Sequence, residues 1–220
     1  PKAIVDYNAG HDLWLWSWPS VEAQCAAIAD DIAYDNHDLD DGLRAGLFTL
    51  DDLVEVPLSG RLLAEIRGEH PSLESRRVHH EIVRRQITVM VEDVITESIG
   101  KLKDAGVQSA NDIRNLDYAV VSFSPEMENA EKTLKAFLFE QMYRHPGVME
   151  PVKQAEKVVG DLFDAYIADP SAMPTDDDWN VAGLSGPARA RRVADYIAGM
   201  TDRYALSEHR RLFDDTPELG

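Results

Sequence analysis

The chain has 220 residues, of which 44% are apolar and 28% charged, and this is enough for a hydrophobic core and excludes a disordered or collagen-like chain. No apolar run approaches the roughly 18 residues of a membrane-spanning helix, so no membrane partner is expected. Forty acidic against 22 basic residues give a formal charge of −18, which repels nucleic acid over most of the surface. The single cysteine, Cys25, cannot form an intramolecular disulfide, and a reducing, cytoplasmic location is expected.

The first part of the chain predicts an arm followed by a helix. Residues 1–19 are expected to be extended, because three tryptophans alternate with other residues between positions 14 and 18 before a proline. Ser20 has the position of an N-cap for a helix that reaches at least Asp38, and Gly42 permits a bend. The apolar residues on one face of this helix predict its buried side: Val21, Cys25, Ile28, Ile32, Leu39 and Leu43.

The rest of the chain predicts more helices. They are expected over residues 57–67, 72–103, 124–145, 149–167 and from 185 through 203. Within the longest of them, the apolar residues at helical spacing are Val78, Ile82, Ile87, Val91, Val94 and Ile99. Residues 118–123 (YAVVSF) are the best candidate for a strand. The pattern as a whole predicts an all-α bundle, with at most a short strand pair near residues 118–123.

The domain organisation follows from the same pattern. We expect one helical unit over residues 1–220, because no internal repeat or low-complexity tract divides the chain. Within it, residues 1–19 form the arm, residues 20–104 part of the helical core, and residues 105–220 a C-terminal helical region.

One helix face carries candidate site residues. Asp30, Tyr34 and Asp38 recur at i, i+4 and i+8 opposite the predicted buried side, beside the small side chains of Ala23 and Ala27. Small residues leave the backbone approachable, which indicates a face recessed against a ligand or a partner. Nine acids and one base lie between positions 30 and 55, so a cation or a positive partner is expected nearby. A solvated acidic helix has the same pattern and stays an alternative.

A basic stripe lies at the start of the longest helix. Arg76, His80 and Arg84 share one face, and arginine gives the forked, charge-assisted hydrogen bonds that triphosphate oxygens accept. Surface salt bridges to the acid-rich helices are the alternative. The case for nucleic-acid binding is weaker still, because no aromatic residues are interleaved with the basic ones to stack on bases. Zinc spacing, a glycine-rich phosphate loop and a nucleophile elbow are all absent from the sequence, and Cys25 lies on the predicted buried face.

Two stretches resemble one family. Residues 29–47 (ADDIAYDNHDLDDGLRAGL), preceded by SVEAQ at 20–24 and HDL at 11–13, are similar to the deoxyguanosinetriphosphate triphosphohydrolase family, within the HD-domain phosphohydrolases. Residues 192–213 (RVADYIAGMTDRYALSEHRRLF) resemble the closing helix of its bacterial members. The resemblance extends over nearly the whole chain. It implies a partial HD-domain-like bundle, with residues 20–104 in the catalytic core.

The resemblance also implies an activity and a site. Such enzymes hydrolyse a deoxynucleoside triphosphate to the deoxynucleoside and inorganic tripolyphosphate, with a divalent metal, Mg²⁺ or Mn²⁺, held by a histidine, a His-Asp pair and a distant aspartate. The distant aspartate corresponds to Asp30, which is then both a metal ligand and catalytic. Tyr34 and the catalytic Asp38 correspond to positions at the sugar and the reacting phosphate. Arg76, His80 and Arg84 match the basic helix that faces the triphosphate.

The sequence departs from the family in one respect. The first histidine and the His-Asp pair have no counterpart, and His37-Asp38 is rejected as that pair because adjacent side chains on a helix diverge. We therefore expect the chain to be the C-terminal portion of the enzyme, inactive by itself, and to form homo-oligomers through exposed core surface. Nucleic acid is expected to bind, if at all, only as a regulator. The alternative function is a non-catalytic helical binding or regulatory module that oligomerises.

Overall fold

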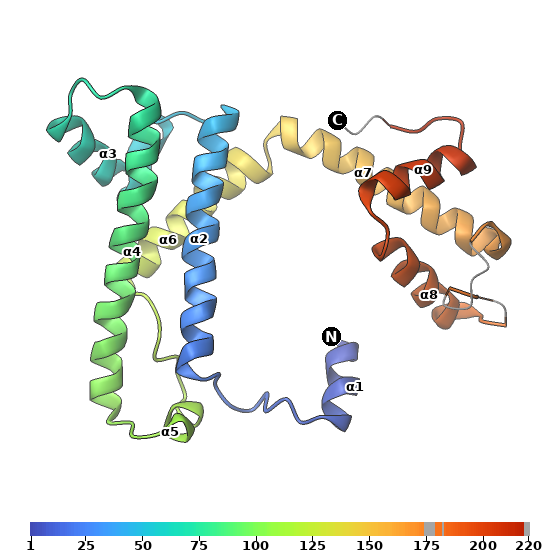
Figure 1. Cartoon of the computed structure of the whole chain (residues 1–220), viewed down its shortest axis with the longest axis horizontal. Coiled ribbons are helices and arrows are strands. Elements are labelled where there is room, and N and C mark those ends of the chain that lie inside the picture. Colours follow the sequence, from blue (N-terminus) through green and yellow to red (C-terminus); the bar gives the residue numbers. More distant parts are fainter. Residues whose placement is uncertain (174–178, 182, 218–220) are drawn as a thin grey trace. The chain divides into compact units, whose positions relative to one another are not determined.

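The computed structural model describes residues 1–173, 179–181 and 183–217, and its regular elements there are all helices (Figure 1). The elements are α1 (Lys2–Gly10), α2 (Val21–Ala45), η1 (Asp52–Glu55), α3 (Pro57–Glu69), α4 (Ser75–Ala105), α5 (Ala110–Arg114), α6 (Pro125–Leu138), η2 (Phe139–Tyr143), α7 (Pro146–Ala168), η3 (Pro170–Ala172), α8 (Gly186–Ala198) and α9 (Asp202–Leu212). The all-α prediction is confirmed. None of the described helices has the length and apolar character needed to cross a bilayer.

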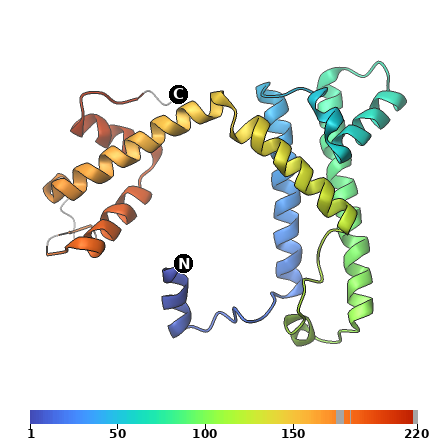
Figure 2. The same cartoon turned by 180° about the vertical axis from the view of Figure 1, so that it is seen from behind.

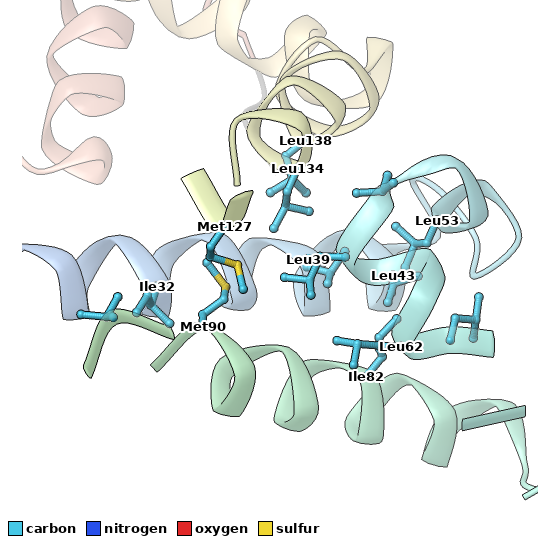
Figure 3. Packing of buried hydrophobic residues seen from close by; sticks show 14 of the residues in the cluster. Ile32, Leu39, Leu43, Leu53, Leu62, Ile82, Met90, Met127, Leu134 and Leu138 are labelled. Atoms are coloured by element: carbon cyan, nitrogen blue, oxygen red, sulfur yellow. The ribbon is translucent and has the colours of Figure 1, made fainter. Parts of the chain in front are cut away.

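The chain divides into two compact units, Pro1–Tyr143 and Arg144–Gly220. The sequence did not mark this division, which falls inside the region expected at 105–220. In the first unit α2 and α4 run side by side in opposite directions, and α6 crosses α2 (Figures 1 and 2). Helix α3 packs against α4 and η1. Figure 3 shows the apolar side chains that meet between these helices, among them Leu39, Leu62, Ile82, Met90 and Leu134.

Helix α2 continues beyond Asp38, the last residue that the sequence required it to reach, and it is not interrupted at Gly42. Ser20 caps it, with its hydroxyl accepting a hydrogen bond from the Ala23 N–H at 3.4 Å, and it ends at Gly46, whose φ of 68° is left-handed. Gly42 lies inside the helix and makes no bend. A Cβ atom at this position would lie 2.2 Å from the Phe48 ring, so glycine is needed here because the ring packs directly on the helix backbone.

The predicted buried faces are only partly correct. On α2, Ile32, Leu39 and Leu43 are buried as expected, but Cys25 is exposed and its assignment to the buried face was wrong. On α4 the buried row recurs every fourth residue: Val78, Ile82, Gln86, Met90, Val94 and Ser98. Val91 and Ile99, two of the apolar residues that recur at helical spacing, are exposed, whereas the polar Gln86 and Ser98 belong to the buried row.

A polar network explains how Gln86 can be buried. Ser59 Oγ donates to Gln86 Oε1 at 2.7 Å, and Gln86 Nε2 donates to Asn36 Oδ1 at 3.1 Å. Asn36 Nδ2 in turn donates to the Ile32 carbonyl oxygen at 2.7 Å. Ser59, Gln86 and Asn36 are all completely buried. Because buried polar groups must find partners, this network links α3, α4 and α2 in one arrangement.

The segment 118–123 contains no strand, although it was the best strand candidate. Its backbone N–H groups bond to side chains instead: Gln24 Oε1 accepts from Val120 and Val121 at 2.9 and 3.1 Å. These contacts satisfy the buried backbone without a sheet. Helix α6 follows, capped by Ser124 as predicted, and continues into the π-helical turn η2.

The N-terminal arm also differs from the prediction. Residues 2–10 form helix α1, and only the segment that follows it, up to residue 20, has no regular secondary structure. The Trp18 N–H donates to the Arg114 carbonyl oxygen at 3.0 Å, which ties this segment to the end of α5.

In the second unit α7 packs against α8 and α9 around Val158, Leu162 and Val193. The last predicted helix is two helices, because Thr201 starts a new one at α9, its hydroxyl accepting from the Tyr204 N–H at 3.3 Å.

Candidate functional site

The candidate site lies on the face of α2 that points away from its buried row. Because α2 is one uninterrupted helix, Asp30, Tyr34 and Asp38 share that face as predicted. Asp30 is exposed and Tyr34 is 60% exposed, whereas Asp38 is half-buried. The face therefore presents one exposed carboxylate and one exposed phenol beside a half-buried carboxylate.

The hydrogen-bond partner of Asp38 is Tyr143, the last residue of η2. The Tyr143 hydroxyl donates a hydrogen bond to Asp38 Oδ2. Burial raises the pKa of Asp38, repulsion from Asp41 adds to this shift, and His37 opposes it. Sequence analysis did not identify Tyr143, because 105 residues separate it from Asp38 and no local pattern connects them. The π-helical turn could have served as a signal only once the structure was known, since such turns often mark functional positions.

A cluster of charges lies next to this site, between α2 and α6. Asp35 is only 2% exposed, and its Oδ2 lies 3.9 Å from Lys135 Nζ without a hydrogen-bond partner. Lys135 also contacts Glu131 and lies 3.7 Å from Asp31. The pKa of Asp35 is raised to about 7: burial is the largest cause, the attraction of Lys135 opposes it, and repulsion from the nearby carboxylates adds to it. The site thus has a carboxyl group beneath it that titrates near neutral pH.

Part of the predicted basic stripe lines a cavity. Arg76 and His80 on α4 are exposed, and they surround a cavity of about 410 Å³ together with Asp40, Arg44 and His79. Arg44 pairs with Asp40 at 2.7 Å. Burial lowers the pKa of His79, against the attraction of Asp40. Arg44 and Arg76 therefore form a local basic patch on an acidic protein, and Asp40 partly neutralises its charge.

Arg84, the third member of the stripe, already has a partner. Its guanidinium donates to both oxygens of Glu81, at 3.0 and 2.6 Å. Arg85 donates to the same carboxylate at 2.8 Å, and the hydrogen bonds from the two arginines lower the pKa of Glu81 to about 2. Arg84 thus forms a surface ion pair, as the alternative interpretation of the basic stripe expects. An incoming anion would have to displace Glu81.

The two predicted sets do not meet within the described residues. No hydrogen bond or ion pair in that part of the chain joins Asp30, Tyr34 or Asp38 to the basic stripe. The described residues also contain no group of three or more histidine, cysteine, aspartate or glutamate side chains that could hold a metal ion. Asp30 offers the carboxylate oxygen that Mg²⁺ and Mn²⁺ prefer, but these ions need several ligands. The residues described here do not complete a metal site.

Comparison with known protein families indicates the class of protein. Residues 121–211 match the phosphohydrolase-associated domain, an assignment that agrees with the helical fold. The whole chain is 54% identical to a deoxyguanosinetriphosphate triphosphohydrolase-like protein of Brucella ovis and covers 55% of it. Proteins of the same description from Mesorhizobium japonicum and Azorhizobium caulinodans are also 54% identical, over 54% of their length.

The predicted resemblance is therefore confirmed. The chain is similar along its entire length to proteins described as deoxyguanosinetriphosphate triphosphohydrolase-like. It spans about half the length of the curated relatives it matches.

Proposed function

We propose that this chain is part of an enzyme that hydrolyses a deoxynucleoside triphosphate to the deoxynucleoside and inorganic tripolyphosphate. The observation that carries the proposal is the 54% identity to proteins described as deoxyguanosinetriphosphate triphosphohydrolase-like, over all of this chain. The arrangement of Asp30, Tyr34 and Asp38 on one accessible face of α2 supports it. The same relationship favours the cytoplasm, where deoxynucleotides are made and used.

In this proposal the face of α2 receives the sugar and the reacting phosphate. Tyr34 is exposed enough to pack against a ring or hydrogen-bond to it. Asp38 has one oxygen engaged by Tyr143, so its other oxygen is left to accept a hydrogen bond from a sugar hydroxyl. The hydrogen bond from Tyr143 fixes the carboxylate before the substrate arrives, which reduces the loss of side-chain freedom on binding.

A divalent ion, Mg²⁺ or Mn²⁺, would activate the attacking water and neutralise charge on the phosphate. We propose Asp30 as one of its ligands, with the remaining ligands supplied by residues outside these 220. The 220-residue chain alone is then expected to show no metal-dependent turnover.

Arg76 and His80 are proposed to bind the triphosphate, joined by Arg44 at the same cavity. Arg84 contributes only if it exchanges Glu81 for a phosphate oxygen. A phosphate group would gain two guanidinium donors here, in a protein whose surface otherwise repels anions.

The test is an assay of the protein in the full length that its gene encodes. Each deoxynucleoside triphosphate is incubated with Mg²⁺ or Mn²⁺, and tripolyphosphate is expected as the inorganic product. Asp30→Asn should abolish turnover, whereas Asp31→Asn, an exposed neighbour off this face, should keep most of it. Release of only phosphate or pyrophosphate would contradict the proposal, and so would full activity of Asp30→Asn.

A second candidate, a non-catalytic helical binding or regulatory module, rests on one observation. In the described residues the acidic face of α2 and the basic stripe of α4 share no hydrogen bond or ion pair, although one substrate is proposed to contact both. Calorimetric titration of the 220-residue chain with a non-hydrolysable deoxynucleoside triphosphate would separate the two candidates. Binding that both Tyr34→Ala and Arg76→Ala weaken supports one shared nucleotide site, and binding that depends on one set alone favours the module.

A further inference from the structure

Asp35 of α2 is buried in a way that the proposed reaction does not explain. Its side chain is 3% exposed, and its Oδ2 atom has no hydrogen-bond partner. An ionised carboxylate in such a place loses its hydration and depends on a nearby opposite charge. Because buried polar groups in native proteins are nearly always hydrogen-bonded, the exception points to a role for this group.

The opposite charge near Asp35 belongs to Lys135 of α6, the helix that packs across α2 (Figure 2). Lys135 Nζ lies 3.9 Å from Asp35 Oδ2, and it contacts Glu131 one turn earlier on its own helix. A hydrogen bond between nitrogen and oxygen needs about 2.7–3.2 Å, so the ammonium group is engaged by Glu131 and lies just short of Asp35. Lys135 therefore has two alternative partners, one on each helix.

The charge of Asp35 decides between these partners. Burial is the largest cause that raises the pKa of Asp35 to about 7. Although burial opposes it, the hydrogen bond with Glu131 and the neighbouring carboxylates raise the pKa of Lys135, so the ammonium group stays charged on both sides of neutral pH. An ionised Asp35 attracts this charge toward α2, whereas a protonated Asp35 leaves it with Glu131.

The groups around Asp35 come from three helices. Its charged neighbours belong to α6 and to α2 itself: Lys135, Glu131, Asp31 and Asp38. Helix α4 also packs against α2, and it meets this stretch with the uncharged Gln86 and Met90, which both contact Asn36. Lys135 is the base in this set, so its ammonium group responds most directly when Asp35 gains or loses a proton.

Lys135 lies on the same continuous helical stretch as Tyr143. Helix α6 runs directly into the π-helical turn η2, whose last residue is Tyr143, and the Tyr143 hydroxyl donates to Asp38. Lys135 and Tyr143 thus join this stretch to α2 at two points. When Lys135 is drawn to α2, the added attraction reduces the freedom of η2 and favours the hydrogen bond at the second point.

We propose that Asp35 is a positioning residue that acts through Lys135. Its ionised form draws the ammonium group, and with it α6, toward α2, which keeps the Tyr143 hydroxyl on Asp38. Its protonated form releases this attraction. The candidate site is then better ordered above neutral pH than below it. The consequence for substrate binding rests on the proposed function, whereas the switch itself needs no nucleotide.

The test follows Tyr143 by NMR in the 220-residue chain, labelled with ¹³Cζ-tyrosine. The seven tyrosines give few signals, and Tyr143→Phe assigns the one that reports the hydrogen bond. Between about pH 5 and about pH 9 this signal should move in a step centred at about pH 7, where Asp35 titrates. Asp35→Asn, which has the same shape and cannot ionise, should abolish the step.

Substitutions of lysine separate the switch from direct repulsion between Asp35 and Asp38. Lys135→Met should abolish the step, and Lys135→Arg should keep it because the positive charge remains. The carboxyl ¹³C signal of Asp35 shows where that group titrates in each variant. The matched control is Lys132→Met, which removes a base of α6 that pairs with Glu128 on its own helix. It should leave the step unchanged.

A parent chain without a step at neutral pH would overturn the proposal, as would a step that survives in Asp35→Asn. A step that Lys135→Met only moves to higher pH would also overturn it, because Asp35 would then act on Asp38 by its charge alone. Far-ultraviolet circular dichroism checks folding, and Lys135→Gln takes the place of Lys135→Met if the latter does not fold. Since no substrate is present, failure of this test and failure of the triphosphohydrolase assay are separate results.

Discussion

Replacing the buried carboxyl group of Asp35 by an amide, Asp35→Asn, should remove a large pH dependence of stability. Burial raises its pKa from 3.8 to about 7, so between these values the folded chain binds a proton that the unfolded chain has released. The free energy of unfolding then falls as the pH rises through this window. Each unit of pKa shift corresponds to about 1.4 kcal/mol, and between pH 5 and pH 8 the loss is about 3 kcal/mol.

Asn cannot titrate, so the variant should lose this dependence and be the more stable protein at pH 8. Lys135 keeps Glu131 and Asp31 as partners after the change. Urea unfolding at pH 5 and pH 8 measures the difference, and hydrogen exchange of the α2 amides localises it to the first unit. Asp31→Asn, whose side chain is 61% exposed beside the same lysine, should change the pH dependence little. An Asp35→Asn variant with the parent's slope would refute the reasoning.

Three further substitutions test the packing and the site. Gly42→Ala should destabilise the first unit by about 1–3 kcal/mol, because the new methyl group overlaps the Phe48 ring; urea unfolding measures this. Gln86→Ala should lose about 2–4 kcal/mol in the same assay, since it leaves a cavity and unpaired polar groups in the buried network. Tyr143→Phe should raise the pKa of Asp38, because it removes a donor to the ionised carboxylate; carboxyl ¹³C NMR titration measures this.

Two of these substitutions, Gly42→Ala and Tyr143→Phe, have a matched control in the chain. A Cβ at Gly68 meets nothing within 4 Å, so Gly68→Ala should be neutral or stabilise by up to about 1 kcal/mol; equal losses at Gly68 and Gly42 would rule out the overlap. Tyr118→Phe, at an exposed tyrosine, should leave Asp38 unchanged. An unaltered Asp38 pKa in Tyr143→Phe would show that the hydrogen bond is absent in solution.

The helices with strong local signals were predictable. Ser124 before Pro125 marked the start of α6, and the face shared by Asp30, Tyr34 and Asp38 followed from their spacing, because an unbroken helix places every fourth residue on one side. The family resemblance was also readable from the sequence, and the comparisons confirm it. The metal role of Asp30 and the phosphate role of Arg76 stay predictions.

The buried row of α4 and the surroundings of Asp38 could not be predicted in this way. Gln86 looks like a surface residue until Ser59 and Asn36, from two other helices, are brought to it. Val91, which shares the apolar helical spacing of this helix, is exposed. The strand candidate at 118–123 failed for the same reason, because a side chain of α2 supplies its hydrogen bonds.

The sequence by itself determined the helical class, most helix starts, the acidic face of α2 and the family relationship, since all of these depend on residues close together in the chain or on long motifs. Only the tertiary structure decided that Tyr143 holds Asp38, that Asp35 is buried beside Lys135, and that Arg84 is engaged by Glu81 while Arg76 is not. Hydrogen bonding, desolvation and charge pairing depend on which side chains meet in space. For Asp38 and Asp35 that meeting joins helices about 100 residues apart in the chain, a separation that no local pattern records.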